Sequence, residues 1–358
     1  METLLLASFI ACVASFILTP LARKAAFALN IVDKPDYRKV HKKAMPYLGG
    51  VAIYLGFMIG FITIWKITDF TPSKFTISYL IGAFIIVVTG VLDDKFNISP
   101  KQKLFGQLMA ACVVVFYGGK MIFLNVPFIS DGMINIGWIG IPIALIWIIG
   151  ITNAVNLIDG LDGLASGVSA IACLSIFGVS VLMGNSTIPL LSILLCGAIL
   201  GFLYFNFHPA KLFMGDTGSL FLGFSLATFS LLEFKQIALI SFIVPILILV
   251  VPISDTFYAM LRRFLNKQPI SAPDKNHLHH RLLQLGLSHR KTVLAIYAIS
   301  AVFGLLAIFL VQTKLWIAFL IILGAVIAIE LFAEMIGLVN HKKYKPLLSI
   351  WNKTFKRK

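Results

Sequence analysis

Asn153-Ala-Val-Asn156-Leu-Ile-Asp159-Gly-Leu-Asp162-Gly-Leu-Ala-Ser-Gly167 is the stretch that decides how this chain folds. Its amide and carboxylate side chains recur at every third position, so a helical turn gathers them roughly on one face. Long apolar runs flank the stretch on both sides. The pattern predicts a polar cluster where a hydrophobic helix meets water. A polar loop in which Asp162 caps the next helix is the plainer interpretation.

The composition is that of a protein with many transmembrane helices. Hydrophobic residues make up 59% of the 358 residues, charged residues only 13%, and the mean hydropathy is +0.95. A soluble domain with one core does not reach these values. At about 20 residues a span, roughly ten spans are expected. The net charge of +15 then indicates basic cytoplasmic loops and a lipid bilayer as the partner, and no nucleic acid.

Eleven apolar runs are predicted to be transmembrane helices: 3–21, 48–66, 75–92, 104–119, 136–152, 165–183, 188–205, 218–233, 236–258, 292–312 and 315–337. Alternate loops then lie on opposite sides of the membrane, and twenty-five of the thirty Lys and Arg residues fall on one side. The positive-inside rule makes that side cytoplasmic. We therefore predict an all-α polytopic membrane protein with its N-terminus outside, its C-terminus cytoplasmic and its active site on cytoplasmic loops. Residues 1–337 form the predicted catalytic domain, and 338–358 a basic cytoplasmic tail.

Aspartates gather at the cytoplasmic ends of these runs: Asp33, Asp36, Asp93, Asp94, Asp159, Asp162, Asp216, Asp255 and Asp274. The positive-inside rule accounts for the basic residues there but not for these acids. Carboxylates grouped at helix ends are typical of a site for a hard cation, Mg²⁺ first. Asp93 and Asp94 lie at the negative end of a helix dipole and repel each other. That arrangement is unfavourable unless a cation or a proton compensates the charge, so we predict a functional pair.

Two further loops combine glycines with charged residues. Asp216, in Phe213-Met-Gly-Asp-Thr-Gly-Ser, either caps the next helix or lies where glycines let a phosphate or a metal approach the backbone. Lys42 precedes Gly49-Gly50, and this combination suits phosphate, although an anchor on acidic lipid explains the lysine equally well. His208, beside a proline, is either an interfacial histidine or part of the site.

A fifth loop, 269–281, carries three histidines, His277, His279 and His280, followed by Arg281. Histidines at this spacing suggest a zinc site, but no cysteine accompanies them. A diphosphate site or a general acid and base fits the basic loop equally well.

These motifs, in this order on cytoplasmic loops, resemble those of the polyprenyl-phosphate N-acetylhexosamine-1-phosphate transferases, which belong to glycosyltransferase family 4. The likeness covers Asp93-Asp94, the Asn-x-x-Asn-x-x-Asp-Gly-x-Asp-Gly-Leu run, Phe-Met-Gly-Asp-Thr-Gly-Ser and His-Leu-His-His-Arg-Leu. The last motif resembles the GlcNAc-1-phosphate branch, including the enzymes that begin wall teichoic acid synthesis. The MurNAc-pentapeptide branch usually has three consecutive histidines there, and this departure leaves the role of each histidine open.

The resemblance implies roles for individual residues. Asp216 matches a Mg²⁺ ligand, and Asp93 and Asp94 match a catalytic pair that also helps to hold the metal. Asp159 and His279 are further catalytic candidates. The implied substrate-binding residues are Lys42, Lys103, Asn153, Asn156, Asp162, Asn206, Phe213, His277, His280 and Arg281.

The implied reaction transfers GlcNAc-1-phosphate from UDP-GlcNAc to undecaprenyl phosphate and releases UMP. It requires Mg²⁺, with Mn²⁺ as a substitute, in a bacterial plasma membrane; a homodimer is expected by analogy alone. Whether attack is direct or passes through an aspartyl-phosphate is open. One alternative is a MurNAc-pentapeptide or other hexosamine-1-phosphate transferase of the same fold. A transporter or flippase is more distant, because its ionisable residues would lie near the bilayer midplane, often within internal repeats.

Overall fold

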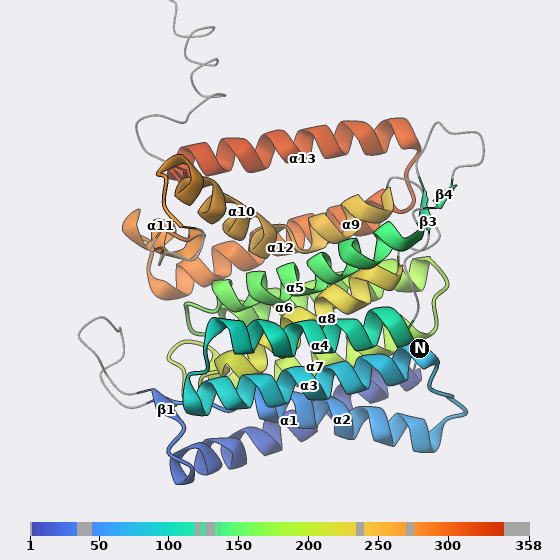
Figure 1. The fold of residues 1–358 in the computed structure, drawn as a ribbon, viewed down its shortest axis with the longest axis vertical. Coiled ribbons are helices and arrows are strands. Elements are labelled where there is room, and N and C mark those ends of the chain that lie inside the picture. Colours follow the sequence, from blue (N-terminus) through green and yellow to red (C-terminus); the bar gives the residue numbers. More distant parts are fainter. Residues whose placement is uncertain are drawn as a thin grey trace, which may run out of the picture.

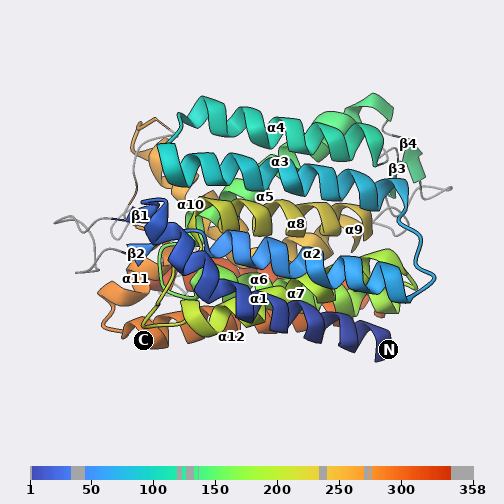
Figure 2. The same cartoon turned by 90° about the horizontal axis from the view of Figure 1, so that it is seen from below.

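The computed structural model describes residues 2–33, 45–118, 123–125, 133–135, 137–233, 240–269, 274 and 276–339. Its helices run side by side as one bundle (Figures 1 and 2). The α-helices are α1 (Glu2–Ala28), α2 (Gly49–Ile67), α3 (Lys74–Phe96), α4 (Pro100–Tyr117), α5 (Gly140–Ile158), α6 (Leu164–Leu182), α7 (Thr187–Asn206), α8 (Gly215–Glu233), α9 (Ile240–Ile248), α10 (Val250–Leu265), α11 (Leu278–Gln284), α12 (His289–Leu310) and α13 (Leu315–Ile336). Short strand pairs join β1 (Val32–Asp33) to β2 (Met45–Pro46), and β3 (Phe123–Asn125) to β4 (Met133–Asn135).

The helical fold class is confirmed, and among the described residues eight helices are long and apolar enough to cross a membrane. Ten of the predicted runs each correspond to one helix. The eleventh, 236–258, is not one helix: it is divided into α9 and α10 at Leu249. Proline at 245 inside α9 and at 252 in α10 removes backbone donors, which favours a break in this region. The count of eleven spans and the orientation of the chain stay predictions.

The helix ends and loops that carry or adjoin the aspartates lie together at one end of the bundle. Strands β1–β2 and helix α11 lie at that end, and the N-terminus and β3–β4 lie at the opposite end (Figures 1 and 2). We call the loops 97–99, 159–163 and 207–214, together with α11, the aspartate end. The predicted tail falls almost wholly outside the described residues, which end at residue 339.

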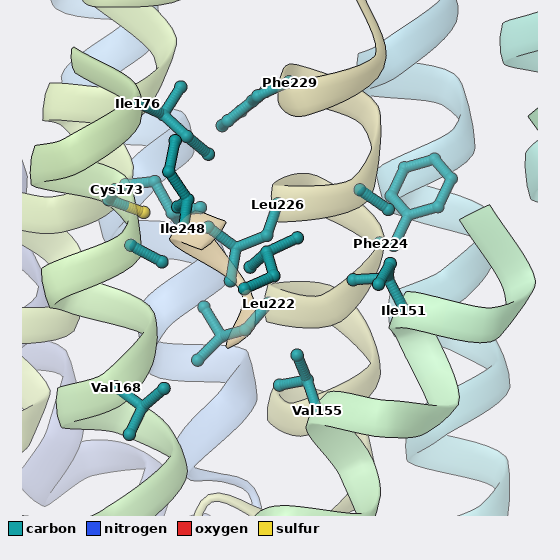
Figure 3. Close-up of a cluster of buried hydrophobic side chains, with 14 of the residues drawn as sticks. Ile151, Val155, Val168, Cys173, Ile176, Leu222, Phe224, Leu226, Phe229 and Ile248 are labelled. Carbon is teal, nitrogen blue, oxygen red and sulfur yellow. The ribbon is translucent and has the colours of Figure 1, made fainter. Parts of the chain in front are cut away.

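Helix α8 is the centre of the bundle, packed by α2, α3, α5 and α6. Its Phe221, Phe224 and Phe229 are fully buried, and Figure 3 shows side chains of α5, α6 and α9 around it. Although α8 was predicted as a span, it is not among the eight described helices that are both long and apolar enough to cross a membrane. A helix enclosed by other helices tolerates Gly, Ser and Thr, because its small residues let neighbouring backbones approach and its hydroxyls find partners.

Two glycine contacts set α8 against its neighbours. A Cβ at Gly50 of α2 would lie 2.1 Å from the nitrogen of Gly218, and a Cβ at Gly90 of α3 would lie 2.3 Å from Cα of Thr217. The absence of a side chain therefore lets both helices touch the first turn of α8. This contact brings the end of α3, with its acid pair, beside Asp216.

Candidate active site

A shared lysine joins two carboxylates at the aspartate end. Lys103 Nζ lies 3.0 Å from Asp93 Oδ2 and 3.0 Å from Asp216 Oδ2. Ser99 and Gln102 form a capping box that begins α4, and this fixes Lys103 on the first turn of the helix. Asp93 comes from the last turns of α3 and Asp216 from the first turn of α8, so three helix ends meet in one ion-pair network.

Asn156 adds α5 to this network. Its Nδ2 donates to Asp216 Oδ1 and, over 2.7 Å, to Ser219 Oγ, while its Oδ1 accepts from Lys103 Nζ over 3.4 Å. We call Asp93, Lys103, Asn156 and Asp216 the acid cluster. The sequence did not single out Ser219, although its place one turn after Asp216 is the signal that would have found it.

Asn153 lies one turn before Asn156 and faces the same helix. Its amide exchanges hydrogen bonds with Gln107 of α4, over 3.2 and 2.7 Å. The predicted common face is therefore correct for the two asparagines, but α5 ends at Ile158, before the two aspartates. The contacts of Asn153 join α4 to α5, and its predicted substrate contact stays a prediction.

Asp94 caps helix α8. Its Oδ1 accepts from the backbone N–H of Asp216 over 2.7 Å, and its Oδ2 accepts from the N–H and the hydroxyl of Thr217 over 3.0 and 2.6 Å. Both oxygens are thus engaged by the start of the helix that carries Asp216. The cap of α8 comes from a distant helix, which a local sequence pattern does not reveal.

Asp159 is the C-cap of α5 and lies near other carboxylates of the site. Burial, and then the negative charges of Asp216, Asp94 and Asp162, raise the pKa of this carboxyl to about 8. Without a bound cation, the carboxyl is therefore mostly protonated at neutral pH. A carboxyl in this state is suited to exchange a proton near pH 7, and the catalytic role of Asp159 stays a prediction.

Asp162 is not the cap of the following helix, because Gly163 holds that position with φ of 78°. Its Oδ2 instead lies 2.7 Å from His208 Nδ1 and accepts from the N–H of Ala210 over 3.1 Å. The plainer interpretation of Asp162 as a helix cap is therefore wrong. The carboxylate fastens the loop after α7 to the start of α6.

Asn206 fastens the same loop from the other side. Its Oδ1 accepts from the N–H of Gly163 and the hydroxyl of Ser166, over 3.1 and 2.8 Å, and its Nδ2 donates to the carbonyl of Leu212 over 3.1 Å. The residue is almost fully buried. Its contacts position the loop that leads to Asp216, and its predicted contact with substrate stays untested.

Backbone hydrogen bonds join the loop at Phe213 to the glycine pair at the start of α2. The N–H of Gly49 donates to the carbonyl of Phe213, and the N–H of Gly50 donates to the carbonyl of Met214, over 3.1 and 2.9 Å. These donors are satisfied by backbone, so the predicted use of Gly49-Gly50 to bind phosphate is not supported. Lys42 lies outside the described residues.

The histidine motif lies at the start of α11 and is separate from the acid cluster. His277 Nδ1 lies 2.8 Å from Asp255 Oδ2, and Asp255 Oδ1 accepts from the N–H of Leu278 over 2.7 Å. A Cβ at Gly160 would lie 2.4 Å from His279 Nε2, so the His279 ring lies directly against the Asp159 segment.

The environment of His279 keeps its imidazole neutral. Burial, followed by the neighbouring His280, lowers the pKa of His279 to about 3. Arg281 donates to Gln284 over 3.2 Å on the exposed side of α11. Within the described part of the chain, the three histidines of this motif do not form a group of metal donors, which weakens the zinc interpretation.

Comparison with known proteins places this geometry in a family. Residues 76–233, from α3 to α8, match the model of glycosyl transferase family 4. Over its whole length the chain is 46% identical to the probable undecaprenyl-phosphate N-acetylglucosaminyl 1-phosphate transferase of Bacillus subtilis (strain 168), covering 98% of that protein. The chain belongs to glycosyl transferase family 4.

More distant relatives of this family 4 enzyme have names that state other substrates. The chain is 32% identical to the decaprenyl-phosphate N-acetylglucosaminephosphotransferase of Mycolicibacterium smegmatis, over 83% of this chain and 79% of that protein. It is 31% identical to the phospho-N-acetylmuramoyl-pentapeptide-transferase of Halalkalibacterium halodurans, over 88% and 97%. The chain is thus a multi-pass membrane enzyme with bacterial relatives.

The family 4 match covers the acid cluster but stops before the histidine motif. The likeness to the Bacillus protein covers both. The predicted site residues outside the acid cluster fall into three sets in the described part of the chain. Asp94, Asn153 and Asp159 lie on or next to the helices of the cluster, and Asp162, Asn206 and Phe213 contact or belong to the loop after α7. The third set is the histidine motif at α11.

Proposed function

We propose that this family 4 enzyme transfers GlcNAc-1-phosphate from UDP-GlcNAc to undecaprenyl phosphate, giving undecaprenyl-diphospho-GlcNAc and UMP. The observation that carries the proposal is the acid cluster, in which carboxylates from α3 and α8 share one cation at a single end of an apolar bundle. Full-length similarity to a relative named for this reaction supports the choice of substrates. Teichoic acid synthesis is the proposed use of the product, from the same branch of the family.

Mg²⁺ is the cofactor that the donors of the acid cluster suit best. Asp93, Asp216 and Asn156 offer oxygen ligands alone, and Mg²⁺ is commonly held by one or two carboxylates together with the phosphates of its substrate. The oxygens of Asp94 are engaged by the start of α8, so the structure favours Asp93 and Asp216 as ligands. When bound, Mg²⁺ would neutralise negative charge on the diphosphate.

The protein side chains would divide the remaining tasks. Lys103 is suited to pair with a phosphate oxygen, because its ammonium lies between the two carboxylates that face the site. Most of the lipid phosphate is already a dianion at neutral pH, because its second pKa is about 6. Asp93 would accept the last proton from the remainder. Asp94 would hold the start of α8, and with it Asp216, in position.

The reaction exchanges one phosphoanhydride for another. An oxygen of the lipid phosphate forms a bond to the β-phosphorus of UDP-GlcNAc, and the bond from that phosphorus to the bridging oxygen breaks. UMP leaves with the bridging oxygen and its electron pair. Because a bond of the same kind is formed and broken, the step should be nearly thermoneutral and reversible.

Turnover of purified protein in detergent tests the proposal. Undecaprenyl phosphate is supplied with either UDP-GlcNAc or UDP-MurNAc-pentapeptide, and UMP and lipid product are measured. We expect product from UDP-GlcNAc alone, loss of turnover with EDTA, and recovery with Mg²⁺ and in part with Mn²⁺. Product from the pentapeptide donor would assign the other branch of the family. Folded protein that releases no UMP from either donor would contradict the proposal and favour a transporter.

A further inference from the structure

Outside the acid cluster, three donor side chains from distant segments converge at the aspartate end. Asp162 lies between α5 and α6, His208 lies in the loop after α7, and His289 is the first residue of α12. One oxygen or nitrogen of each lies within 4.8 Å of the other two. Within the described ranges, this is the one such group of three His, Cys, Asp or Glu residues.

Two of the three donors are already held in place. Asp162 Oδ2 lies 2.7 Å from His208 Nδ1 and accepts from the N–H of Ala210 over 3.1 Å. Arg290 Nε donates to the carbonyl of His208 over 3.2 Å. The carboxylate and the first imidazole are therefore oriented by three segments of the chain without any ligand.

His289 has one ring nitrogen that the fold does not use, although its imidazole also makes a hydrogen bond with the backbone of Asp162. Its ring stacks on that of His208 with centroids 4.0 Å apart and planes at 20°, and its Nε2 is buried without a hydrogen-bond partner. The pair of Asp162 and His208 is enough to fasten the loop to α6. The Nε2 atom of His289 is left over, and this buried, unpaired nitrogen costs roughly 1–3 kcal/mol unless something binds it.

We propose that Asp162, His208 and His289 form a site for a transition-metal ion of the zinc class. Two imidazole nitrogens and one carboxylate favour Zn²⁺ over Mg²⁺, which prefers oxygen ligands alone. Donors of a tetrahedral zinc site lie about 3.4 Å apart when the bonds are near 2.0–2.1 Å. The donors lie within 4.8 Å of one another, so the widest pair closes by at most about 1.4 Å, while Asp162 and His208 separate by about 0.7 Å from 2.7 Å. Rotation of the two half-exposed histidines can supply both movements. Three protein ligands leave a fourth position for water.

An occupied site would join the segment after α5, the loop after α7 and the start of α12. Asp162 lies in the same stretch as Asn156 of the acid cluster, so fixing it should restrain the segment that borders the proposed active site. We therefore expect Zn²⁺ to slow turnover at saturating Mg²⁺. This expectation about turnover rests on the proposed function, whereas binding of the metal does not.

Metal binding by tag-free protein in detergent, with Mg²⁺ present in excess, tests the site directly. Zn²⁺ binding is measured by calorimetry, and Co²⁺ replaces it as a visible-absorption probe of tetrahedral coordination. We expect one ion per chain. Because even an outer-shell change costs about 10–100-fold in metal affinity, His208→Ala and His289→Ala should each weaken binding by at least about tenfold. His280→Ala, a half-buried histidine of α11 outside the group, is the matched control and should bind normally.

Three results would overturn the proposal: no Zn²⁺ bound by folded wild-type protein, wild-type Zn²⁺ affinity in both His208→Ala and His289→Ala, or loss of binding in His280→Ala instead. Size-exclusion profiles with EDTA establish that each variant is folded. Protein that binds Zn²⁺ but releases no UMP under any condition would contradict the proposed function and leave the metal site intact. Zn²⁺ that inhibits wild type and His289→Ala equally would remove the link between the site and turnover.

Discussion

Lys103 supplies the positive charge that two carboxylates share at the acid cluster. Lys103→Met should lower turnover at least about a hundredfold, as the loss of one fixed donor to a transition state typically does. It should also tighten Mg²⁺ binding, because the ammonium no longer competes for Asp93 and Asp216. Lys101→Met, an exposed lysine of the same helix, is the control. Turnover and calorimetry measure the two effects, and unchanged turnover in Lys103→Met would exclude Lys103 from the site.

Asp94 caps α8 whereas Asp93 belongs to the acid cluster, so Asp94→Asn and Asp93→Asn should differ in their effect on stability. Asp94→Asn replaces one acceptor oxygen with a donor and should lower the free energy of unfolding by about 1–3 kcal/mol as well as turnover. Asp93→Asn should abolish turnover with a smaller loss of stability. Thermal unfolding in detergent and the UMP assay measure both. Equal stability of the two variants would contradict the capping role of Asp94.

The lowered pKa of His279 predicts how folding stability depends on pH. Its pKa is lowered from 6.5 to about 3 by burial, so the unfolded chain binds a proton that the folded chain excludes. Folding stability therefore falls as pH drops below about 6.5, by up to about 1.4 kcal/mol per pH unit from this group.

The variant His279→Gln removes that contribution. Between pH 7.5 and 5.5, wild type should lose about 1 kcal/mol more stability than His279→Gln. The midpoint of thermal unfolding at both pH values is the measurement, with His280→Gln as the control. An identical pH response in wild type and His279→Gln would show that the ring is not buried as the structure has it.

At the scale of elements, the close contact between α2 and α8 positions the site. Gly50→Ala places a Cβ 2.1 Å from the nitrogen of Gly218, against backbone that has little room to move. We expect a loss of about 1–3 kcal/mol in stability and a larger fall in turnover than stability alone explains. Gly150→Ala in α5 meets nothing within 4 Å and is the matched control. Its stability should be equal to or slightly above wild type.

Helix α13 lies at the outer edge of the bundle (Figure 1). Side chains of α10, α12 and α13 line an apolar cavity. Tyr258 donates to Glu330 Oε2 over 2.7 Å and joins α10 to α13. The cavity residues include Phe303, Ile329 and Phe332, which are compatible with a lipid environment. The last predicted helix thus adds to the bundle without taking part in the acid cluster.

For the whole molecule, the distribution of basic residues predicts which side each loop faces. Twenty-five of thirty Lys and Arg residues lie on one side of an eleven-span arrangement, so the C-terminus should be cytoplasmic. Green fluorescent protein fused after Lys358 should fluoresce, and alkaline phosphatase fused at the same residue should be inactive. The reverse result would mean that the number of spans is even or that the orientation is inverted.

The sequence by itself determined the helical membrane fold and the residue types of the site, because apolar runs of fixed length and charges at their ends are local signals. It correctly predicted that Asn153 and Asn156 share a helix face. It did not predict the break between α9 and α10, the cap of α8 by Asp94, or the pairing of Asp162 with His208. Each of these depends on contacts between segments far apart in the chain. Only the tertiary structure decided which aspartates share a cation and which one caps α8, because the glycine contacts bring α2 and α3 onto α8.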